Sequence, residues 1–268
     1  MRQLLGVEHV SAKTRKKLKN TRWSLSNLSL FGAVDMDLES LGYDSGNYWY
    51  NRTPDIESTY AQAESGAAVG DSEYDGLFLT FTSLKDRSKL RGNTHTFEAF
   101  NLITPKIFEA VGGSPGQRPE DYEELKKHLM EAMLNTTERV LPGVRDHLVF
   151  ADIGTPATNR FYVRSVDGNM YGSEKSAWQV GPFAFSVRTE VKGLYLCGSS
   201  TLGHGVAGAT MSGLVAAAKT LRCPLSELLT ETDTSLECWP ADDLAQWPER
   251  ARQRAMESRY REGAAARG

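Results

Sequence analysis

The sequence is poor in cysteine and has no long apolar run. Its three cysteines, Cys197, Cys223 and Cys238, form an odd and sparse set without the spacing of a metal site or a disulfide framework. No apolar stretch approaches the roughly 18–20 residues that a membrane-spanning helix needs. Residues 1–10 contain neither the apolar core nor the cleavage site of a secretory signal. These absences predict a cytoplasmic protein that holds no metal.

A strong excess of charge of one sign is also missing. The 31 Lys and Arg residues nearly balance the 34 Asp and Glu residues, so the net charge is only −3. A nucleic-acid-binding protein usually carries a strongly basic face, and this class is therefore excluded. The content of 40% hydrophobic residues, 24 glycines and 10 prolines is that of an ordinary globular protein. The 268 residues suffice for one large domain or two small ones.

Charge is nevertheless distributed unevenly along the chain. Residues 11–22 hold six basic side chains and no acidic one, and residues 35–75 hold ten acidic side chains against one base, Arg52. Either these are two solvated surfaces, or the basic stretch faces a partner or an anionic membrane surface. Peripheral membrane contact is therefore one of the alternatives that the sequence leaves open.

Alternation of apolar and polar residues predicts several strands. Residues 24–34 alternate imperfectly, and residues 76–83 and 95–103 are β-rich segments that we expect to pair with each other. A further strand is predicted over residues 161–166, followed by a turn at Asp167-Gly168.

Two helices are predicted from their boundary residues. The first covers residues 55–69, after Pro54. The second begins near Pro119, carries acidic side chains in its first turns and ends before Pro142-Gly143. The composition of residues 112–119, just before it, is typical of a loop.

Residues 193–220 are the most informative part of the sequence. The short apolar run of residues 193–198 ends in glycine, as buried parallel strands do. A loop rich in glycine and serine follows, and then a helix of small residues whose N-terminus lies near Val206. Its free N–H groups and partial positive charge suit the electron-rich edge of a cofactor. An ordinary glycine-lined helix packed on a sheet remains the alternative.

The chain lacks a dinucleotide-binding fingerprint. That fingerprint is G-x-G-x-x-G after a first strand, with an acidic residue about 20 positions later. Residues 203–208, GHGVAG, match the spacing formally, but they lie late in the chain after a long loop. No acidic residue in a second strand follows them, so they do not qualify.

Two stretches together resemble a known family. TPATNRFYVRSVDGNMYG (155–172) and VKGLYLCGSSTLGHGVAGATMSGLVAAA (191–218) are similar to the C-terminal half of phytoene desaturase-like flavoproteins. That group includes carotenoid desaturases, carotenoid isomerases and retinol saturases. Residues 122–158 resemble the family's helix, PG turn and TP-T strand, and residues 81–100 resemble the middle of its substrate domain. The resemblance covers roughly residues 1–220.

The resemblance implies a fold class and a division of the chain. It implies an α+β or α/β protein: a substrate domain with a mixed β-sheet and helices, and the C-terminal strand-loop-helix of a Rossmann-type FAD domain whose N-terminal half is missing. Residues 1–190 would form the substrate-domain-like region, with residues 1–23 as a basic lead-in. Residues 191–220 would belong to the FAD domain, and residues 221–268 would form a charged tail.

Family members are about twice as long, which leaves three explanations for the missing half. The gene is naturally split, the chain is a degenerate paralogue, or it is a fragment. A decaying remnant would have lost the Gly/Ser loop and the small-residue helix, so a split enzyme is favoured. The expected partner is then a polypeptide that carries the G-x-G-x-x-G unit.

The resemblance also implies a cofactor, FAD, and residues that meet it. Gly198 and Ser199 would lie along the ribityl-diphosphate, and the backbone of Gly205, Val206 and Ala207 would face the flavin ring. Glycine suits such places because the chain approaches the ligand without a Cβ.

Other side chains near this loop have weaker expected roles. His204 is a weak catalytic candidate, with a plain polar contact as the alternative. Met211 and Ser212 are expected to pack, so Ser212→Ala should be mild. Cys197 ends an apolar run and is expected to be an inert buried thiol.

Three aromatic residues are candidates for substrate contact. Tyr162 and Tyr171 lie on the unit before the flavin loop, and Trp49 belongs to the cluster Tyr48-Trp49-Tyr50. Each has core or surface packing as the alternative.

The sequence therefore favours one hypothesis and keeps a second. The first is the C-terminal, substrate-domain subunit of a split FAD-dependent oxidoreductase that desaturates, saturates or isomerises a hydrophobic polyene or lipid-like compound. The flavin would carry the chemistry, so no acid–base pair is required. The second is a non-catalytic lipid-binding or scaffold protein derived from the same family.

Overall fold

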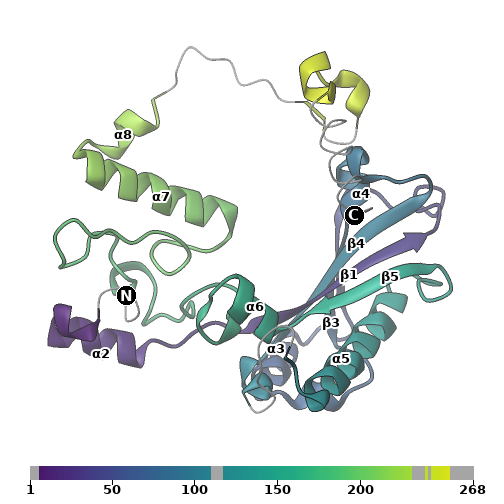
Figure 1. The fold of residues 1–268 in the computed structure, drawn as a ribbon, viewed down its shortest axis with the longest axis horizontal. Helices are drawn as coiled ribbons and strands as arrows, with labels where there is room; N and C mark the ends of the chain where they lie inside the picture. Colours follow the sequence, from purple (N-terminus) through teal and green to yellow (C-terminus); the bar gives the residue numbers. More distant parts are fainter. Residues whose placement is uncertain (1–5, 110–116, 231–238, 241–242, 254–268) are drawn as a thin grey trace. The chain divides into compact units, whose positions relative to one another are not determined.

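The computed structural model describes residues 6–109, 117–230, 239–240 and 243–253 (Figure 1). Residues 112–116 of the predicted loop, Cys238 and much of the predicted tail lie outside these ranges. The chain divides into two compact units. Unit 1 is Met1–Ser26 with Pro156–Ser235, and unit 2 is Asn27–Thr155 with Leu236–Gly268.

Unit 2 is built on one antiparallel five-stranded sheet with the order β2-β3-β4-β1-β5. Antiparallel registers join β2 to β3, β3 to β4, and β1 to β5. The prediction of a mixed sheet is therefore corrected: β2, β3 and β4 follow one another and pair by direct reversal, and β1, inserted between β4 and β5, pairs antiparallel with β5. The predicted pairing of the segments 76–83 and 95–103 is confirmed as β3 with β4. The strands are β1 (Ser26–Asp35), β2 (Asn47–Asn51), β3 (Gly76–Phe81), β4 (Thr94–Ile103) and β5 (Leu148–Gly154).

One face of this sheet forms the hydrophobic core. Alternate residues of β1 and β4 are buried, among them Leu28, Leu30 and Phe97. Helix α5 (Glu120–Glu138) contacts β3, β4 and β5, and its Leu129 and Met133, one turn apart, are fully buried. Pro119 precedes α5 and acidic residues fill its first turn, as the sequence predicted. The shorter elements of unit 2 are α3 (Ile56–Ser65), η2 (Ala67–Gly70), α4 (Thr82–Lys85), η3 (Arg87–Lys89), η4 (Pro105–Phe108) and η7 (Leu244–Gln246).

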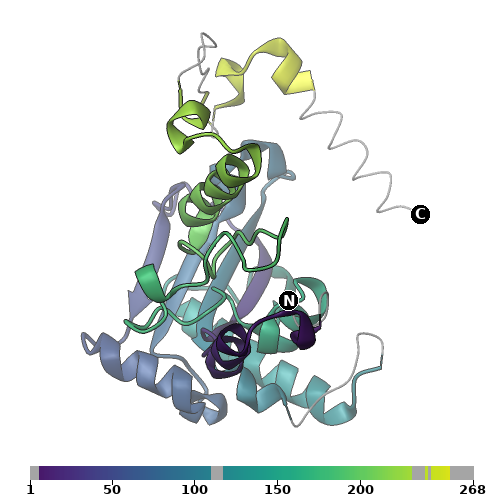
Figure 2. The ribbon, with the colours of Figure 1, turned by 90° about the vertical axis from the view of Figure 1, so that its left-hand side faces the viewer.

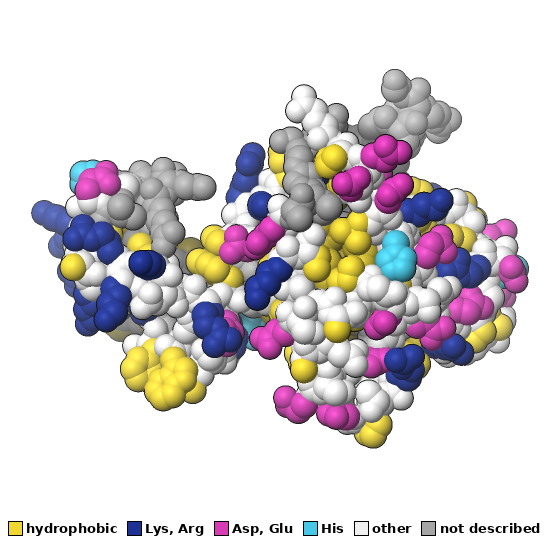
Figure 3. All heavy atoms as spheres, turned by 90° about the horizontal axis from the view of Figure 1, so that it is seen from below, with side chains coloured by type: hydrophobic (Ala, Val, Ile, Leu, Met, Phe, Trp, Pro, Cys, Tyr) yellow, Lys and Arg dark blue, Asp and Glu magenta, His cyan; other side chains and the backbone are white. Residues whose placement is uncertain are grey.

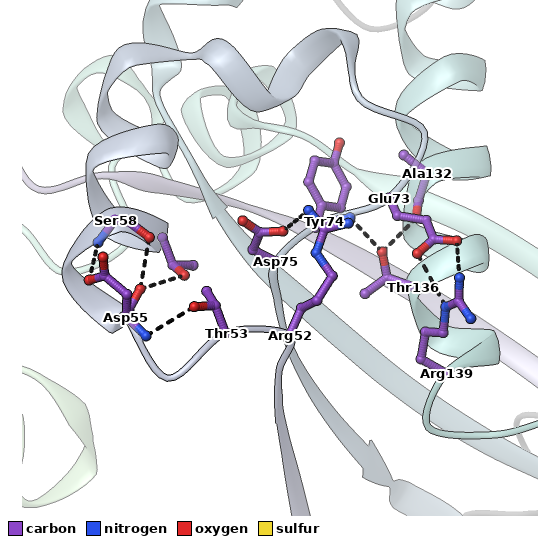
Figure 4. Close-up of polar contacts among 11 residues, drawn as sticks. Arg52, Thr53, Asp55, Ser58, Glu73, Tyr74, Asp75, Ala132, Thr136 and Arg139 are labelled. Atoms are coloured by element: carbon purple, nitrogen blue, oxygen red, sulfur yellow. Dashed lines mark hydrogen bonds and ion pairs between the residues drawn. The ribbon is translucent and has the colours of Figure 1, made fainter.

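Polar contacts fix the segment that leads into β3 (Figure 4). The Tyr74 N–H donates to Thr136 Oγ1 of α5 over 2.8 Å, and Arg139 pairs with Glu73. Helix α3 begins at Asp55, whose carboxylate accepts from the Ser58 N–H. It ends at Gly66 in the left-handed conformation, which confirms the predicted helix and selects Gly66 over Gly70 as its end.

His95 gives unit 2 a predictable pH dependence. Its ring is buried, and its Nδ1 lies 3.0 Å from the Ser83 hydroxyl, which accepts from the Thr96 N–H. Burial lowers the pKa of His95, and Arg87 acts in the same direction against Glu39 and Asp37. The unfolded chain therefore binds a proton at a higher pH than the folded chain. The contribution of neutral His95 to folding stability is therefore fully present above the ordinary histidine pKa of about 6.5. It declines as the pH falls toward the lowered pKa of His95 in the folded chain.

We expect His95→Gln to flatten this decline in thermal denaturation measured from neutral to mildly acid pH. The exposed His147 provides the matched control, and His147→Gln should leave the decline in place. Superimposable pH curves for wild type and His95→Gln would show that this histidine does not set the acid sensitivity.

Unit 1 contains helices and irregular chain, and no strand longer than an isolated bridge among its described residues (Figure 2). Helix α2 covers most of the basic stretch, and α7 is the predicted small-residue helix. The chain between α6 and α7 runs as loops and short turns. The elements are η1 (Val7–His9), α2 (Ala12–Asn20), α6 (Pro156–Tyr162), η5 (Val166–Gly168), η6 (Gly181–Phe183), α7 (Gly205–Leu221) and α8 (Leu225–Leu228).

Two strands predicted in unit 1 are wrong. The first two residues of 161–166 belong to the end of α6 and the rest to irregular chain that leads into η5, because Pro156 starts a helix and Arg164 and Asp167 adopt positive φ. The predicted turn at Asp167-Gly168 is present. Residues 193–198 form only the single bridge Arg188–Tyr195, so the strand of a partial Rossmann sheet is not observed.

Candidate functional site

The Gly/Ser loop before α7 is fastened to that helix by Ser212. This side chain is fully buried, and its Oγ accepts from the Gly198 N–H over 2.7 Å. It also lies 2.5 Å from Thr201 Oγ1, which donates to the Gly198 carbonyl over 2.7 Å. The start of the loop is thereby held in one conformation by three linked hydrogen bonds.

The end of the loop lies directly against α7 at Gly208. A Cβ on Gly208 would stand only 2.6 Å from the Gly203 carbonyl carbon and 2.8 Å from its oxygen. These are backbone atoms, so a side chain here would push the loop away from the helix. The sequence marked Gly208 only as one of several small residues and gave no sign of this contact.

A second segment supports the loop from its other side. The Ser173 N–H donates to Ser200 Oγ over 3.1 Å, and a Cβ on Gly172 would meet the hydroxyls of Ser199 and Ser200. Lys175 Nζ donates to the Ser199 carbonyl over 2.5 Å. Burial lowers the pKa of Lys175. The ammonium group thus stands beside a loop that the sequence assigned to a diphosphate, and nothing in the sequence pattern singled it out.

The five predicted cofactor residues come together around this loop. Gly198 and Gly205 have φ of +103° and +73°, and a Cβ on either would meet no atom within 4 Å. Val206 is 88% exposed, and Ala207 beside it is exposed too. The N-cap residue His204 makes no side-chain hydrogen bond to the first N–H groups of α7. Ser199 lies in the loop between its two supports.

His204 and Tyr171 are brought together, although the sequence treated them separately. His204 is the residue before α7, and its ring centroid lies 4.4 Å from that of Tyr171. Tyr162 lies at the end of α6 and is exposed, not on the strand that was expected to carry it. Cys197 is exposed as well, so the expectation of a buried thiol is corrected.

Trp49 lies on the face of the unit 2 sheet opposite the core. It stands opposite Phe78 in the register of β2 and β3, and Phe78 stands opposite Phe100 in that of β3 and β4. The Trp49 and Phe78 rings meet edge to face at 4.9 Å, and the Phe78 and Phe100 rings stack at 4.7 Å. Trp49 is 69% exposed. We call these three residues the aromatic row.

The basic stretch forms a charged surface on unit 1. Lys and Arg side chains gather at the left end of Figure 3, where α2 lies. None of the residues of α2 is buried. Beside it is a cavity of about 280 Å³, lined by Lys17, Asn20, Thr21, Arg22, Ser173, Ser176, Trp178, Gln179, Phe183 and Phe185. That this basic surface meets a partner or an anionic membrane stays a prediction.

The hydrogen bonds of Ser212 predict a larger effect of Ser212→Ala than the sequence did. Removing the hydroxyl leaves the Gly198 N–H without its acceptor, which typically costs about 1–3 kcal/mol. We expect faster amide hydrogen exchange across residues 198–201. Thr220→Ala is the matched control, because the Thr220 hydroxyl bonds only to Ala216 within α7. Equal exchange in both variants would show that Ser212 does not hold the loop.

The described residues include no cluster of three or more His, Cys, Asp or Glu side chains arranged to bind a metal. None of the helices in the described ranges is long and apolar enough to cross a bilayer.

Comparison with known proteins gave curated relatives but no matching family model. The chain is 25% identical over 207 residues to all-trans-retinol 13,14-reductase of Danio rerio, which covers 75% of this chain and 34% of the relative. The Homo sapiens protein of the same name is 23% identical, over 83% of this chain and 38% of the relative. Prolycopene isomerase of Arabidopsis thaliana is 25% identical, over 61% and 27%. The chain thus spans about a third of the length of these relatives.

These matches agree with the resemblance seen in the sequence. The two kinds of relative differ in their reactions, but both carry names that refer to conjugated polyenes. The chain is therefore a homologue of retinol reductases and prolycopene isomerases, which belong to the phytoene desaturase-like carotenoid oxidoreductase group.

Proposed function

We propose that this chain is the C-terminal, substrate-domain part of an FAD-dependent oxidoreductase that acts on a hydrophobic polyene or other lipid-like compound. The second part is a polypeptide that carries the G-x-G-x-x-G unit. The observation that carries the proposal is the segment of residues 198–207, since it combines two glycines in positive φ, open space beside both of them and the first N–H groups of α7, which no N-cap side chain bonds. Saturation, desaturation and isomerisation are all compatible with it.

The residues of the loop fit a flavin nucleotide. The open spaces beside Gly198 and Gly205 allow a flat ligand to approach the backbone. The uncapped N–H groups of α7 favour the electron-rich edge of the ring, and Lys175 offers positive charge beside Ser199. A bound flavin would supply hydride exchange at its N5 atom. The chain's own residues would then orient the cofactor and exclude water from the substrate.

The surface of unit 1 supports the need for a second polypeptide. Among its described residues, the buried apolar side chains are Val10, Ala157, Val187 and Ala218. The exposed ones are larger and include Tyr162, Val163, Trp178, Phe183, Leu202, Val206 and Leu221. Exposed apolar surface of this extent is typical of an interface with another chain or domain. We therefore expect a heteromer whose partner covers unit 1.

We propose that the substrate binds on the aromatic row. Phe78 and Phe100 stack, and Trp49 meets both rings edge to face, so the row presents a continuous apolar surface that fits an extended conjugated chain. Tyr162 and Tyr171 are proposed as further contacts near the loop.

The alternative function is a non-catalytic lipid-binding or scaffold protein. It would use the aromatic row for binding and would not need the loop. Turnover separates the two functions: the purified complex with the expected partner should convert a conjugated polyene, and the chain alone should not. A complex that binds the polyene without changing its absorption spectrum under reducing or oxidising conditions would favour the alternative.

A further inference from the structure

The cavity beside α2 lies within unit 1 and is built from two segments that are far apart in the sequence. Its lining comes from residues 17–22, at the end of α2 and just after it, and from residues 173–185. Backbone contacts join the two segments. The Glu174 N–H donates to the Arg22 carbonyl over 2.9 Å, and the side-chain amide of Gln179 bonds to both the N–H and the carbonyl of Arg22. The walls of the cavity are therefore fixed by the fold of unit 1.

Three aromatic side chains, Trp178, Phe183 and Phe185, form the apolar part of this lining. Trp178 is 80% exposed and Phe183 is 56% exposed, although large aromatic side chains usually bury most of their surface. A flat apolar group in the cavity would cover part of both. The volume of about 280 Å³ lies just below the usual range of small-molecule pockets. The cavity therefore fits a small ring system and does not enclose a long chain.

Lys17 supplies a positive charge to the cavity. Its Nζ donates to the Ala184 carbonyl over 2.6 Å and lies 4.8 Å from the centre of the Phe185 ring. None of the ion pairs found within the described ranges involves it. Burial lowers the pKa of Lys17, and the charge of Lys13 acts in the same direction. An ammonium group has three donors, so donors remain for a ligand, and a partly desolvated cation gains from an anionic partner.

The second cation of the lining is already neutralised. Arg22 Nε lies 2.6 Å from Glu174 Oε2. Gln179 is occupied by its bonds to the backbone, and Thr21 Oγ1 donates to the Lys17 carbonyl. Of the two cations that line the cavity, only Lys17 lacks a carboxylate partner among the described residues. The cavity therefore favours a ligand with a single negative charge.

We propose that this cavity binds a small planar monoanion, an aromatic carboxylate, whose ring packs on Trp178 and Phe183 and whose carboxylate accepts from Lys17 Nζ. The site is independent of the proposed function, since it includes neither the Gly/Ser loop nor the aromatic row. A dianionic phosphate fits less well, because it would need a second unpaired cation. A neutral ring would leave the Lys17 ammonium without an anion.

The test is isothermal titration calorimetry of the full chain with three probes: naphthoate, the neutral naphthamide and acetate. The two naphthyl probes have nearly the same shape and differ in charge, whereas acetate carries the charge without a ring. We expect naphthoate to bind about tenfold more tightly than naphthamide, as one charge-assisted hydrogen bond gives, and acetate to give no measurable binding. Equal affinity for the two naphthyl probes, or equal affinity for acetate and naphthoate, would overturn the proposal.

Two pairs of variants separate the cavity from the rest of the basic surface. Lys17→Met removes the charge and should make the affinities for the two naphthyl probes equal. Lys16→Met, at the exposed neighbour on the same helix, should leave their ratio unchanged. Trp178→Ala should weaken the binding of both probes severalfold. Trp49→Ala, which removes an exposed tryptophan from unit 2, should have no effect.

Each control also has an outcome that contradicts the proposal. If Lys16→Met lowers the ratio as much as Lys17→Met does, the basic surface attracts anions without a defined site. If Trp49→Ala weakens binding and Trp178→Ala does not, the probes bind on the aromatic row of unit 2. Either result would overturn the proposal. The comparison of probes on the unaltered chain needs no variant, so it remains decisive even if Lys17→Met fails to fold.

Discussion

Gly205→Leu is expected to abolish flavin binding and turnover in the assembled complex while the chain still pairs with its partner. Gly205 begins α7 with φ of +73°, and a Cβ there would point into open space. A leucine side chain would fill the space that the proposed flavin ring needs. Positive φ for a residue with a side chain adds strain of order 1–3 kcal/mol, which a large interface can offset. Flavin content and turnover of the co-purified complex are the measurements.

Gly205→Ala separates strain from obstruction. It carries the same positive φ but adds only a methyl group, so it should retain more flavin than Gly205→Leu does. If Gly205→Leu keeps full flavin occupancy and normal turnover, the loop does not meet the cofactor. If both variants lose flavin equally, strain at the start of α7 is the cause.

Gly208→Ala is expected to displace the Gly/Ser loop from α7. The added Cβ would stand within 3 Å of three backbone atoms of Gly203, so the loop must shift. Overpacking of this kind typically costs about 1–3 kcal/mol. The proposed cofactor residues before and after Gly203 would move with it. We expect a lower melting temperature of unit 1 and loss of flavin from the complex.

Gly213→Ala is the matched control on the same helix. A Cβ on Gly213 meets no atom within 4 Å, and alanine favours a helix interior over glycine by roughly 0.5–1 kcal/mol. This variant should therefore raise the melting temperature slightly. A similar loss of stability in both variants would mean that helix content, not the contact with Gly203, explains the effect of Gly208→Ala.

The elements of unit 2 could be predicted because their local signals agree with their tertiary setting. The residues of β4 alternate between buried and less buried positions, and those of β3 are β-rich and mostly buried. Helix α5 has a proline at its start and a buried stripe that includes Leu129 and Met133. In these segments the residue pattern and the tertiary packing favour the same secondary structure.

The errors in unit 1 have a different origin. Residues 161–166 are β-rich by composition, but the positive φ of Arg164 and Asp167 is incompatible with a strand. No residue pattern in the sequence predicts this positive φ. The apolar run 193–198 has a strand's composition without a neighbouring strand in the described part of unit 1. A strand needs a partner that composition cannot supply.

The cofactor role of the loop glycines stays a prediction, and the side chains that hold the loop in place were not found from the sequence. Gly198 and Gly205 have the backbone conformations that make glycine necessary, as expected for a ligand-facing loop. Ser212 and Lys175 lie 14 and 24 residues from their partners Gly198 and Ser199. Such contacts depend on how the chain folds back on itself, so a single sequence gives no signal for them.

The most direct test of the proposed division of the enzyme is to co-express this chain with the proposed partner, the polypeptide that carries the G-x-G-x-x-G unit. An absorption spectrum of the purified complex is then recorded. We predict a yellow heteromer with a stoichiometric flavin, and a colourless preparation of this chain alone, because the proposal assigns the pyrophosphate-binding G-x-G-x-x-G unit to the partner. A stoichiometric flavin on the chain alone, or a complex without flavin, would contradict the proposal.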